Sequence, residues 1–267
     1  MALLEGLVIV VAAGLFTALV CGLGTLPFFF TDELSDAWTV ALWGLAAGIM
    51  LAASLFGFIF EGLAEGSAFQ VGSGFVAGIA LVVLASRLID DHEFEPGEFS
   101  AADTKKVALI VAVLTVHSFP EGVALGVAFA DVGLEGGVAI GGVAIPTLAI
   151  LITIAISIQN IPEGLAVAIP LHTYGASKWK LFGAAVLTSI PQPVGAAIAF
   201  VFVTIARQFL PFGFGFAAGA MVYLVIHDLI PEALEHGEDL PNGGKRELAI
   251  GFLLGVVTML PLLVVTE

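Results

Sequence analysis

The chain has 267 residues, of which 59% are hydrophobic and 12% are charged, and its mean hydropathy is +1.10. Soluble domains average about 25% charged and about 45–50% apolar residues, so this composition excludes an ordinary soluble globular protein. The net charge of −15, from 23 acidic and 8 basic residues, gives no reason to expect a nucleic-acid partner.

Eight apolar segments follow one another along the chain, each close to the length that crosses about 30 Å of hydrocarbon. They span residues 3–28, 38–60, 68–88, 107–130, 142–170, 180–206, 210–233 and 247–265. Charged and turn-forming residues separate them, and no stretch remains that could fold as a soluble domain. We therefore expect an all-α, polytopic membrane protein with eight transmembrane helices in a single domain, residues 1–267.

The basic residues predict the orientation of these helices. Seven of the eight lie in odd-numbered connections, and Arg207 alone lies in an even-numbered one. The seven are Arg87, Lys105, Lys106, Lys178, Lys180, Lys245 and Arg246. Because lysine and arginine concentrate in cytoplasmic loops, we expect the odd connections in the cytoplasm and both termini outside.

The fourth and fifth segments carry the same motif twice. His117-Ser-Phe-Pro-Glu121-Gly recurs 42 positions later as Gln159-Asn-Ile-Pro-Glu163-Gly. In each copy a ligand-type side chain stands four residues before a glutamate, which places both on one face of a helix. Both faces fall near the middle of their segments and hence near the middle of the bilayer.

An acid at this depth needs compensation, because it costs about 2.5–3.5 kcal/mol on insertion scales. No lysine or arginine occurs between Lys106 and Lys178. If the two helices are neighbours, their carboxylates cannot both ionise cheaply, so protons or a cation must compensate. The imidazole of His117 and the oxygens of Glu121, Glu163, Gln159 and Asn160 suit Zn²⁺, Fe²⁺ or Mn²⁺ better than Ca²⁺ or Cu⁺.

Two prolines strengthen this interpretation. Pro120 and Pro162 each deprive the carbonyl four residues earlier, on Val116 and Ile158, of its helical hydrogen bond. Such interruptions at corresponding mid-membrane positions are typical of a transporter's binding site.

A third polar group lies near the end of the seventh segment. Asp228 and Glu232 are four residues apart and share a helix face, next to His227. We expect a transient metal site here on the cytoplasmic side. The alternative is a polar helix end at the membrane interface.

Taken together, these segments resemble the ZIP family of divalent-metal transporters, and most closely its prokaryotic GufA-like branch. The resemblance rests on the two Pro-Glu motifs, on GLAAGIMLAAS at 44–54, on SIPQPVGA at 189–196 and on HDLIPEA in the seventh segment. It implies inverted repeats of spans 1–3 and 6–8 around a central pair, spans 4 and 5. It also implies movement of zinc or a related metal into the cytoplasm by alternating access, a multi-pass place in the plasma membrane, and often a homodimer.

The resemblance further implies roles for individual residues. The metal would bind to His117, Glu121, Gln159 and Glu163, with Met50 lining the site. A second, adjacent metal position would use Ser118, Asn160 and Gln192. These three stand where the family often has asparagine, aspartate and glutamate, so we expect one strong metal position and a weak or absent second one. No cofactor is expected, and Zn²⁺, Fe²⁺, Mn²⁺ or Cd²⁺ would be bound as substrate.

Three other interpretations use the same residues. A proton-coupled carrier of a small solute could use the two carboxylates without a metal. The glutamates could also be a protonated structural bridge between helices, although that role requires neither His117 nor a doubled motif. An intramembrane metalloprotease would need two histidines on one helix, as in H-E-x-x-H, and the five histidines here form no such pair, so no enzyme activity is expected.

Overall fold

The computed structural model describes residues 3–31, 34–90, 115, 118–134, 137–173 and 175–260. Most of these residues are helical. The helices are α1 (Leu3–Leu23), α2 (Pro27–Phe30), α3 (Asp36–Ala52), α4 (Phe60–Glu65), α5 (Ala68–Asp90), residues 118–128, α7 (Thr147–Thr173), α8 (Lys178–Thr188), α9 (Pro191–Ile205), α10 (Leu210–Leu224), α11 (Ile230–His236) and α12 (Lys245–Thr258). Short π-helical segments, Ala53–Ile59 and Val225–Leu229, join α3 to α4 and α10 to α11. Two short 3₁₀ segments, Arg207–Phe209 and Pro241–Gly244, precede α10 and α12.

Within the described residues, six helical stretches are long and apolar enough to cross a membrane. They are Leu3–Phe30, Asp36–Glu65, Ala68–Arg87, Thr147–His172, Lys178–Ile205 and Arg207–His236. The prediction of a helical, multi-pass membrane protein is therefore confirmed. The two other predicted segments lie partly outside the described residues, which include only helix 118–128 and α12 from them.

The predicted start of the fifth segment at residue 142 was wrong. Strands β1 (Val138–Ile140) and β2 (Val143–Ile145) form an antiparallel hairpin there, and α7 begins only at Thr147. Gly141 and Gly142 form the turn with φ of +59° and +85°, a left-handed backbone that favours glycine. The hairpin was missed because its residues are as apolar as those of the helix that follows.

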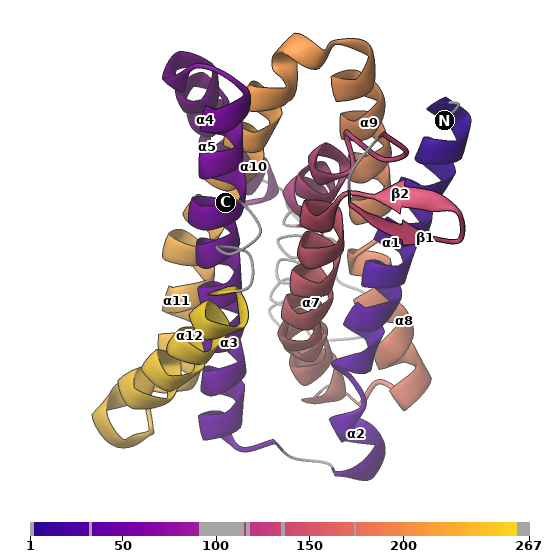
Figure 1. Ribbon diagram of the computed structural model, residues 1–267. Helices are drawn as coiled ribbons and strands as arrows, with labels where there is room; N and C mark the ends of the chain where they lie inside the picture. Colours follow the sequence, from indigo (N-terminus) through magenta and orange to yellow (C-terminus); the bar gives the residue numbers. More distant parts are fainter. Residues whose placement is uncertain are drawn as a thin grey trace.

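The helices form two groups, which Figure 1 shows side by side. The first group, here called the glycine-paired bundle, contains α3, α4, α5, α10, α11 and α12, with main contacts between α3 and α12 and between α5 and α10. The second, here called the motif bundle, contains α1, helix 118–128, α7, α8 and α9. The two bundles meet mainly where α3 packs against α7.

Glycines set the close helix contacts of the glycine-paired bundle. Gly44 and Gly48 on α3 lie against carbonyl groups of α12, and Gly251 and Gly255 on α12 lie against carbonyl groups of α3. The same reciprocal arrangement joins α5 and α10, through Gly74, Gly78, Gly215 and Gly219. A β-carbon at any of these positions would collide with backbone, so these small residues allow the close approach of helices that is typical of packing in lipid.

Contacts between the connections show that the chain alternates between two ends of the molecule. At one end Gln70 Nε2 donates a 3.0 Å hydrogen bond to Gln208 O, and Arg207 pairs with Asp131, which joins the second, fourth and sixth connections. At the other end Lys178 Nζ donates a 3.1 Å hydrogen bond to Phe29 O, which joins the first and fifth. The described odd and even connections thus lie at opposite ends, as predicted.

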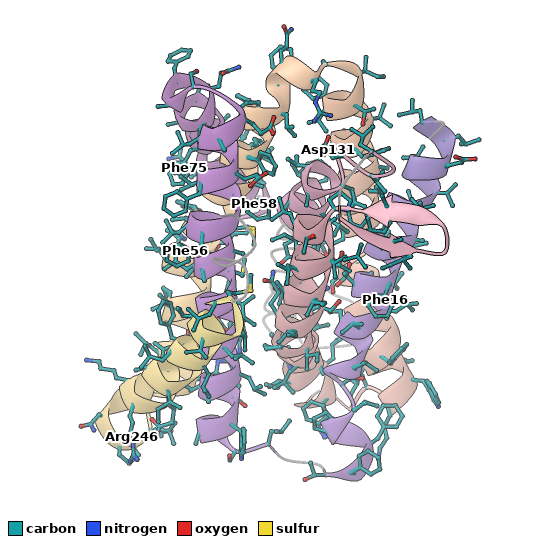
Figure 2. All side chains as sticks on the ribbon, viewed as in Figure 1. Phe16, Phe56, Phe58, Phe75, Asp131 and Arg246 are labelled. Atoms are coloured by element: carbon teal, nitrogen blue, oxygen red, sulfur yellow. The ribbon has the colours of Figure 1, made fainter. Side chains whose placement is uncertain are left out.

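The side of the molecule between these ends is apolar. Large hydrophobic side chains project outward there, among them Phe16 at 56% exposure and Leu253 at 63%, and Figure 2 shows Phe16, Phe56 and Phe75 along the helices. Asp131 and Arg246 lie towards opposite ends. This distribution is the one that a bilayer selects, with hydrocarbon around the middle and charges at both surfaces.

Candidate metal centre

The two Pro-Glu motifs meet inside the motif bundle. Glu121 on helix 118–128 and Gln159 on α7 are both 0% exposed, and Gln159 Nε2 donates a 2.6 Å hydrogen bond to Glu121 Oε1. Glu163, one turn further along α7, is 6% exposed and lies within electrostatic and hydrogen-bonding reach of Glu121. The two helices are therefore neighbours, as the sequence predicted, and their glutamates share one buried site.

This proximity has a chemical consequence. A hydrogen bond between two carboxyl groups requires that one of them carries a proton, and two buried carboxylates in contact repel each other strongly. A divalent cation between them removes the repulsion and can replace the proton. The pair is thus suited to exchange protons for a metal.

Gln159 has an unsatisfied oxygen at this site. Its Oε1 atom is buried and has no hydrogen-bond partner among the residues that the structure describes, while its Nε2 atom is held by Glu121. A buried amide oxygen without a partner costs about 1–3 kcal/mol. An oxygen left in this state next to two carboxyl groups is a ready ligand for a metal ion, so the donor set fits the predicted cargo.

A second polar group lies on the other side of Glu121. Gln192 at the start of α9 donates through Nε2 to Glu121 Oε2, and it exchanges two 3.1 Å hydrogen bonds with the side chain of Asn160 on α7. Thr17 on α1 completes the group, with its hydroxyl 2.9 Å from Gln192 Oε1 and its carbonyl accepting a 2.8 Å bond from Asn160 Nδ2. All three side chains are 0–1% exposed.

The backbone around the site is packed closely. Gly122 lies against the carbonyl of Gln192, and Gly164, next to Glu163, lies against the carbonyl of Cys21 on α1. Helix α7 continues through Pro162 and Pro170 without interruption. The prolines therefore remove hydrogen bonds from α7 without ending it, and the polar side chains are presented from continuous helices.

The other predicted ligands have different positions. His117 lies outside the described residues. Ser118 is 1% exposed on the Glu121 helix, and Met50 is 0% exposed on α3, the helix of the other bundle that packs against α7. In the described part of the chain, no three histidine, cysteine, aspartate or glutamate side chains gather closely enough to hold a metal ion. The described side chains thus supply only part of the ligand set that the sequence predicts.

The third predicted group, His227, Asp228 and Glu232, stands apart from the carboxylate pair. His227 and Asp228 lie in the π-helical segment after α10, with His227 Nδ1 2.9 Å from Asp228 Oδ1. The His227 side chain is 61% exposed and stacks on Tyr223 at 4.8 Å between ring centroids. The role of these three residues in metal exit stays a prediction.

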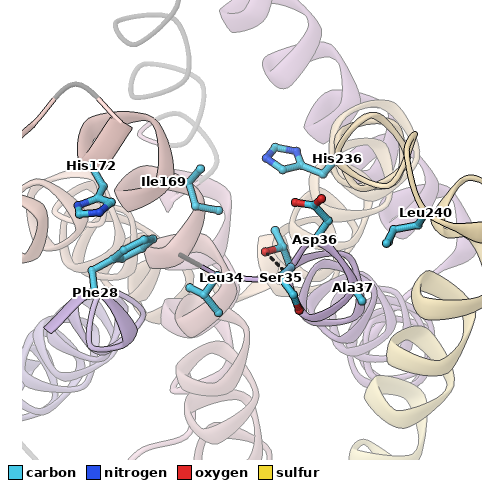
Figure 3. Close-up of a pocket in the computed structure, with 10 residues that line it drawn as sticks. Phe28, Leu34, Ser35, Asp36, Ala37, Ile169, His172, His236 and Leu240 are labelled. Atoms are coloured by element: carbon cyan, nitrogen blue, oxygen red, sulfur yellow. Dashed lines mark hydrogen bonds between the residues drawn. The ribbon is translucent and has the colours of Figure 1, made fainter. Parts of the chain in front are cut away.

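A cavity of about 560 Å³ opens at the end of the molecule that holds the odd connections. Its walls come from both bundles, with Phe28, Ile169 and His172 on one side and Asp36 and His236 on the other (Figure 3). His172 packs against Phe28, with ring centroids 4.7 Å apart. Ile169 follows Glu163 on α7 by six residues, or about 9 Å of helix, so this cavity and the buried site lie along the same helix.

Sequence reasoning missed Thr17. It is a single polar residue in the apolar run of α1, with no motif around it. Its depth within that run was the only available signal, because a buried hydroxyl in a transmembrane helix usually has a hydrogen-bond partner on the same or a neighbouring helix.

Comparisons with known proteins agree with one another. Residues 90–263 match the family model described as ZIP Zinc transporter. The chain is 39% identical over 240 residues to a protein of Arabidopsis thaliana named "Putative zinc transporter". The aligned region covers 89% of this chain and 36% of the plant protein. It is 32% identical over 261 residues to the zinc transporter GufA of Myxococcus xanthus, covering 94% and 96%, and 32% identical over 253 residues to the zinc transporter ZIPB of Bordetella bronchiseptica, covering 89% and 75%. The chain thus spans about a third of the plant protein but nearly all of the bacterial GufA.

Proposed function

Because the chain belongs to the ZIP family of zinc transporters, we propose that it carries Zn²⁺ through a membrane by way of the buried carboxylate site. Fe²⁺, Mn²⁺ and Cd²⁺ are further candidates for the same site. Members of this family are membrane metal transporters and not enzymes, and the metal is their substrate, with no cofactor involved. The observation that supports this proposal most strongly is the unpartnered Gln159 Oε1 atom beside the Glu121–Glu163 pair.

In this proposal the metal is bound by His117, Glu121, Gln159 and Glu163, with Met50 lining the site from α3. Binding displaces the proton held between the two carboxyl groups. A bound Zn²⁺ ion, with mixed nitrogen and oxygen ligands, would offset the repulsion between the two carboxylates. It would also coordinate the Gln159 Oε1 atom. The cost of burying these polar groups is therefore offset when the metal is bound.

Transport then requires that the site is exposed to the two membrane faces in turn. The motif bundle carries the site, and the two bundles meet mainly at α3 and α7, so we propose that the motif bundle slides or rocks against the glycine-paired bundle. Metal leaves through the cavity between Phe28 and Asp36, with His227, Asp228 and Glu232 as exit ligands.

We further propose eight spans built as inverted repeats, spans 1–3 and 6–8, in the plasma membrane with both termini outside. The reciprocal glycine contacts support the repeats, because spans 2 and 8 pack in the same way as spans 7 and 3. A π-helical segment in each of spans 2 and 7 fits the same relation. The basic residues support the orientation. A homodimer is the partner that the family resemblance suggests.

Metal binding to purified protein tests the nature of the cargo. The thermal unfolding midpoint should rise when Zn²⁺ is added, and competition with Fe²⁺, Mn²⁺ and Cd²⁺ should rank their affinities. Glu163→Gln should lose most of this rise, whereas Glu235→Gln, the same change at an exposed helix position, should keep it. If no divalent metal stabilises the wild-type protein, the proton-coupled carrier of a small solute becomes the better proposal.

A further inference from the structure

Thr17, Asn160 and Gln192 form a buried group, here called the amide hub, that joins α1, α7 and α9 beside Glu121. The hub is nearly saturated with hydrogen bonds. Gln192 Nε2 uses its two hydrogens on Glu121 Oε2 and Asn160 Oδ1, and Asn160 Nδ2 uses its two on Thr17 O and Gln192 Oε1. The Thr17 hydroxyl lies 2.9 Å from both Gln192 Oε1 and Gly14 O and can donate its one proton to either.

The orientation of the Gln192 amide is fixed by this arrangement. If the amide were turned over, its oxygen would face the Glu121 carboxylate and its nitrogen would face the Asn160 and Thr17 donors. Glu121 Oε2 therefore meets one N–H hydrogen of Gln192 on the hub side. A cation placed there would face that hydrogen instead of free lone pairs.

The two amides on either side of Glu121 thus differ. Gln159 and Gln192 each donate to one carboxylate oxygen, but only Gln159 has an unpartnered oxygen left for a ligand. The amide oxygen that can still coordinate a metal therefore belongs to Gln159, whereas the amide oxygen of Gln192 already accepts hydrogen bonds.

Close backbone packing keeps the hub in place. A β-carbon on Gly14 of α1 would lie 2.7 Å from Pro193 Cα, and one on Gly195 of α9 would lie 2.6 Å from Phe119 O. The start of α9 is therefore held between α1 and helix 118–128. Because these backbones are in contact, the hub side chains are held next to Glu121.

We propose that the amide hub takes the place of a second metal ion, so that the site holds one divalent cation per chain on the Gln159 side. Gln192 is then the residue that determines the metal stoichiometry, and Thr17 and Asn160 are positioning residues that hold its amide towards Glu121. This inference rests on the proposed metal-binding function. It reassigns Asn160 and Gln192 from expected weak ligands to hydrogen-bonding partners.

The test is to replace the neutral amide with a carboxylate. Gln192→Glu removes the two N–H donors and adds oxygen ligands next to Glu121, so this variant should bind a second ion beside the first. With Co²⁺ as the probe on purified full-length protein, two ions that share Glu121 would be exchange-coupled, which alters the electron paramagnetic resonance signal. The wild type should show only uncoupled Co²⁺, and Gln192→Glu should show a coupled pair.

Gln70→Glu is the matched control, because it makes the same chemical change at a partly buried position at the start of α5, away from the site. It should remain uncoupled. A coupled pair in the wild type would overturn the inference, and so would an uncoupled signal from a folded Gln192→Glu protein that binds Co²⁺. If the wild type binds no metal at the site at all, the proposed function itself fails, and the two failures are therefore distinguishable.

Thr17 gives a second test that does not depend on the stability of Gln192→Glu. Thr17→Val removes the hydroxyl at nearly constant volume and should weaken metal affinity about three- to tenfold, the worth of one hydrogen bond. Thr17→Ser keeps the hydroxyl and should restore the wild-type affinity. Equal affinities for the valine and serine variants would contradict the positioning role.

Discussion

The buried polar side chains at the centre of the motif bundle differ in how many of their polar atoms form hydrogen bonds. Most of the buried amide and hydroxyl atoms there have hydrogen bonds, whereas Gln159 Oε1 has none within the described part of the chain. Buried polar atoms in native proteins are rarely left without a partner. The exception at Gln159 therefore marks the position at which a ligand completes the structure.

Replacing Gln159 tests this interpretation directly. Gln159→Leu removes the oxygen ligand and also the donor to Glu121, so metal affinity should fall at least tenfold. Without metal, the free energy of unfolding of the variant should fall by about 1–3 kcal/mol because the hydrogen bond to Glu121 is lost. Removal of the buried, unpartnered amide oxygen should offset part of this loss. Calorimetric Zn²⁺ titration measures the first effect and chemical unfolding the second. An unchanged Zn²⁺ affinity would exclude Gln159 as a ligand.

The sequence predicted much at this scale. The spacing of four residues placed Gln159 and Glu163 on one helix face, whereas the proximity of Glu121 was a condition of the charge argument that only the family resemblance implied. The hub could not be predicted, because Thr17 lies 143 residues before Asn160. Contacts between residues so distant in the chain depend on how helices pack, which periodicity does not specify.

At the scale of helices, reciprocal glycine pairs hold the glycine-paired bundle together. In lipid, helices gain no hydrophobic free energy from association with each other, so close backbone contact supplies much of the attraction. The spacing of four residues between these glycines made the packing role predictable. Which helices pair was not predictable, since the same spacing occurs in many segments. The π-helical segments left no recognised signal in the sequence either.

Helix α5 contains both a packed and an open glycine, which allows a matched comparison. A β-carbon at Gly78 would collide with the backbone of α10, whereas one at Gly72 would meet no atom within 4 Å. Gly78→Ala should therefore lower the free energy of unfolding by about 1–3 kcal/mol through overpacking. Gly72→Ala should be neutral or stabilising by up to about 1 kcal/mol, because alanine favours the helix. Thermal unfolding in detergent measures both, and equal effects would contradict the packing role.

At the scale of the whole molecule, the two bundles contribute different residues to the buried site and to the cavity. The motif bundle holds the acids of the site, and the glycine-paired bundle contributes Met50 and most of the wall around Asp36 and His236. The six described helical stretches that are long and apolar enough to cross a membrane were largely predictable from hydropathy. The division into bundles was not, because hydropathy is nearly the same along every segment and carries no information on neighbours.

The proposed orientation can be tested by labelling from one side of the membrane. Ala37 lines the cavity at the odd-connection end, and Ala139 is exposed on the hairpin at the other end. In intact cells an impermeant thiol reagent should label Ala139→Cys and should reach Ala37→Cys only after the membrane is opened. The single native cysteine, Cys21, is buried and should stay unlabelled in the parent protein. Labelling of Ala37→Cys from outside would reverse the orientation.

The central claim is that a divalent metal ion crosses the membrane through the Glu121–Glu163 site, and Zn²⁺ uptake into proteoliposomes tests it most directly. Wild-type protein should take up Zn²⁺ well above empty liposomes, and Glu235→Gln should match it. Glu163→Gln, folded and inserted to the same level, should fall to the rate of empty liposomes, because the cargo loses a charged ligand at mid-membrane depth. Undiminished uptake by Glu163→Gln would contradict the account.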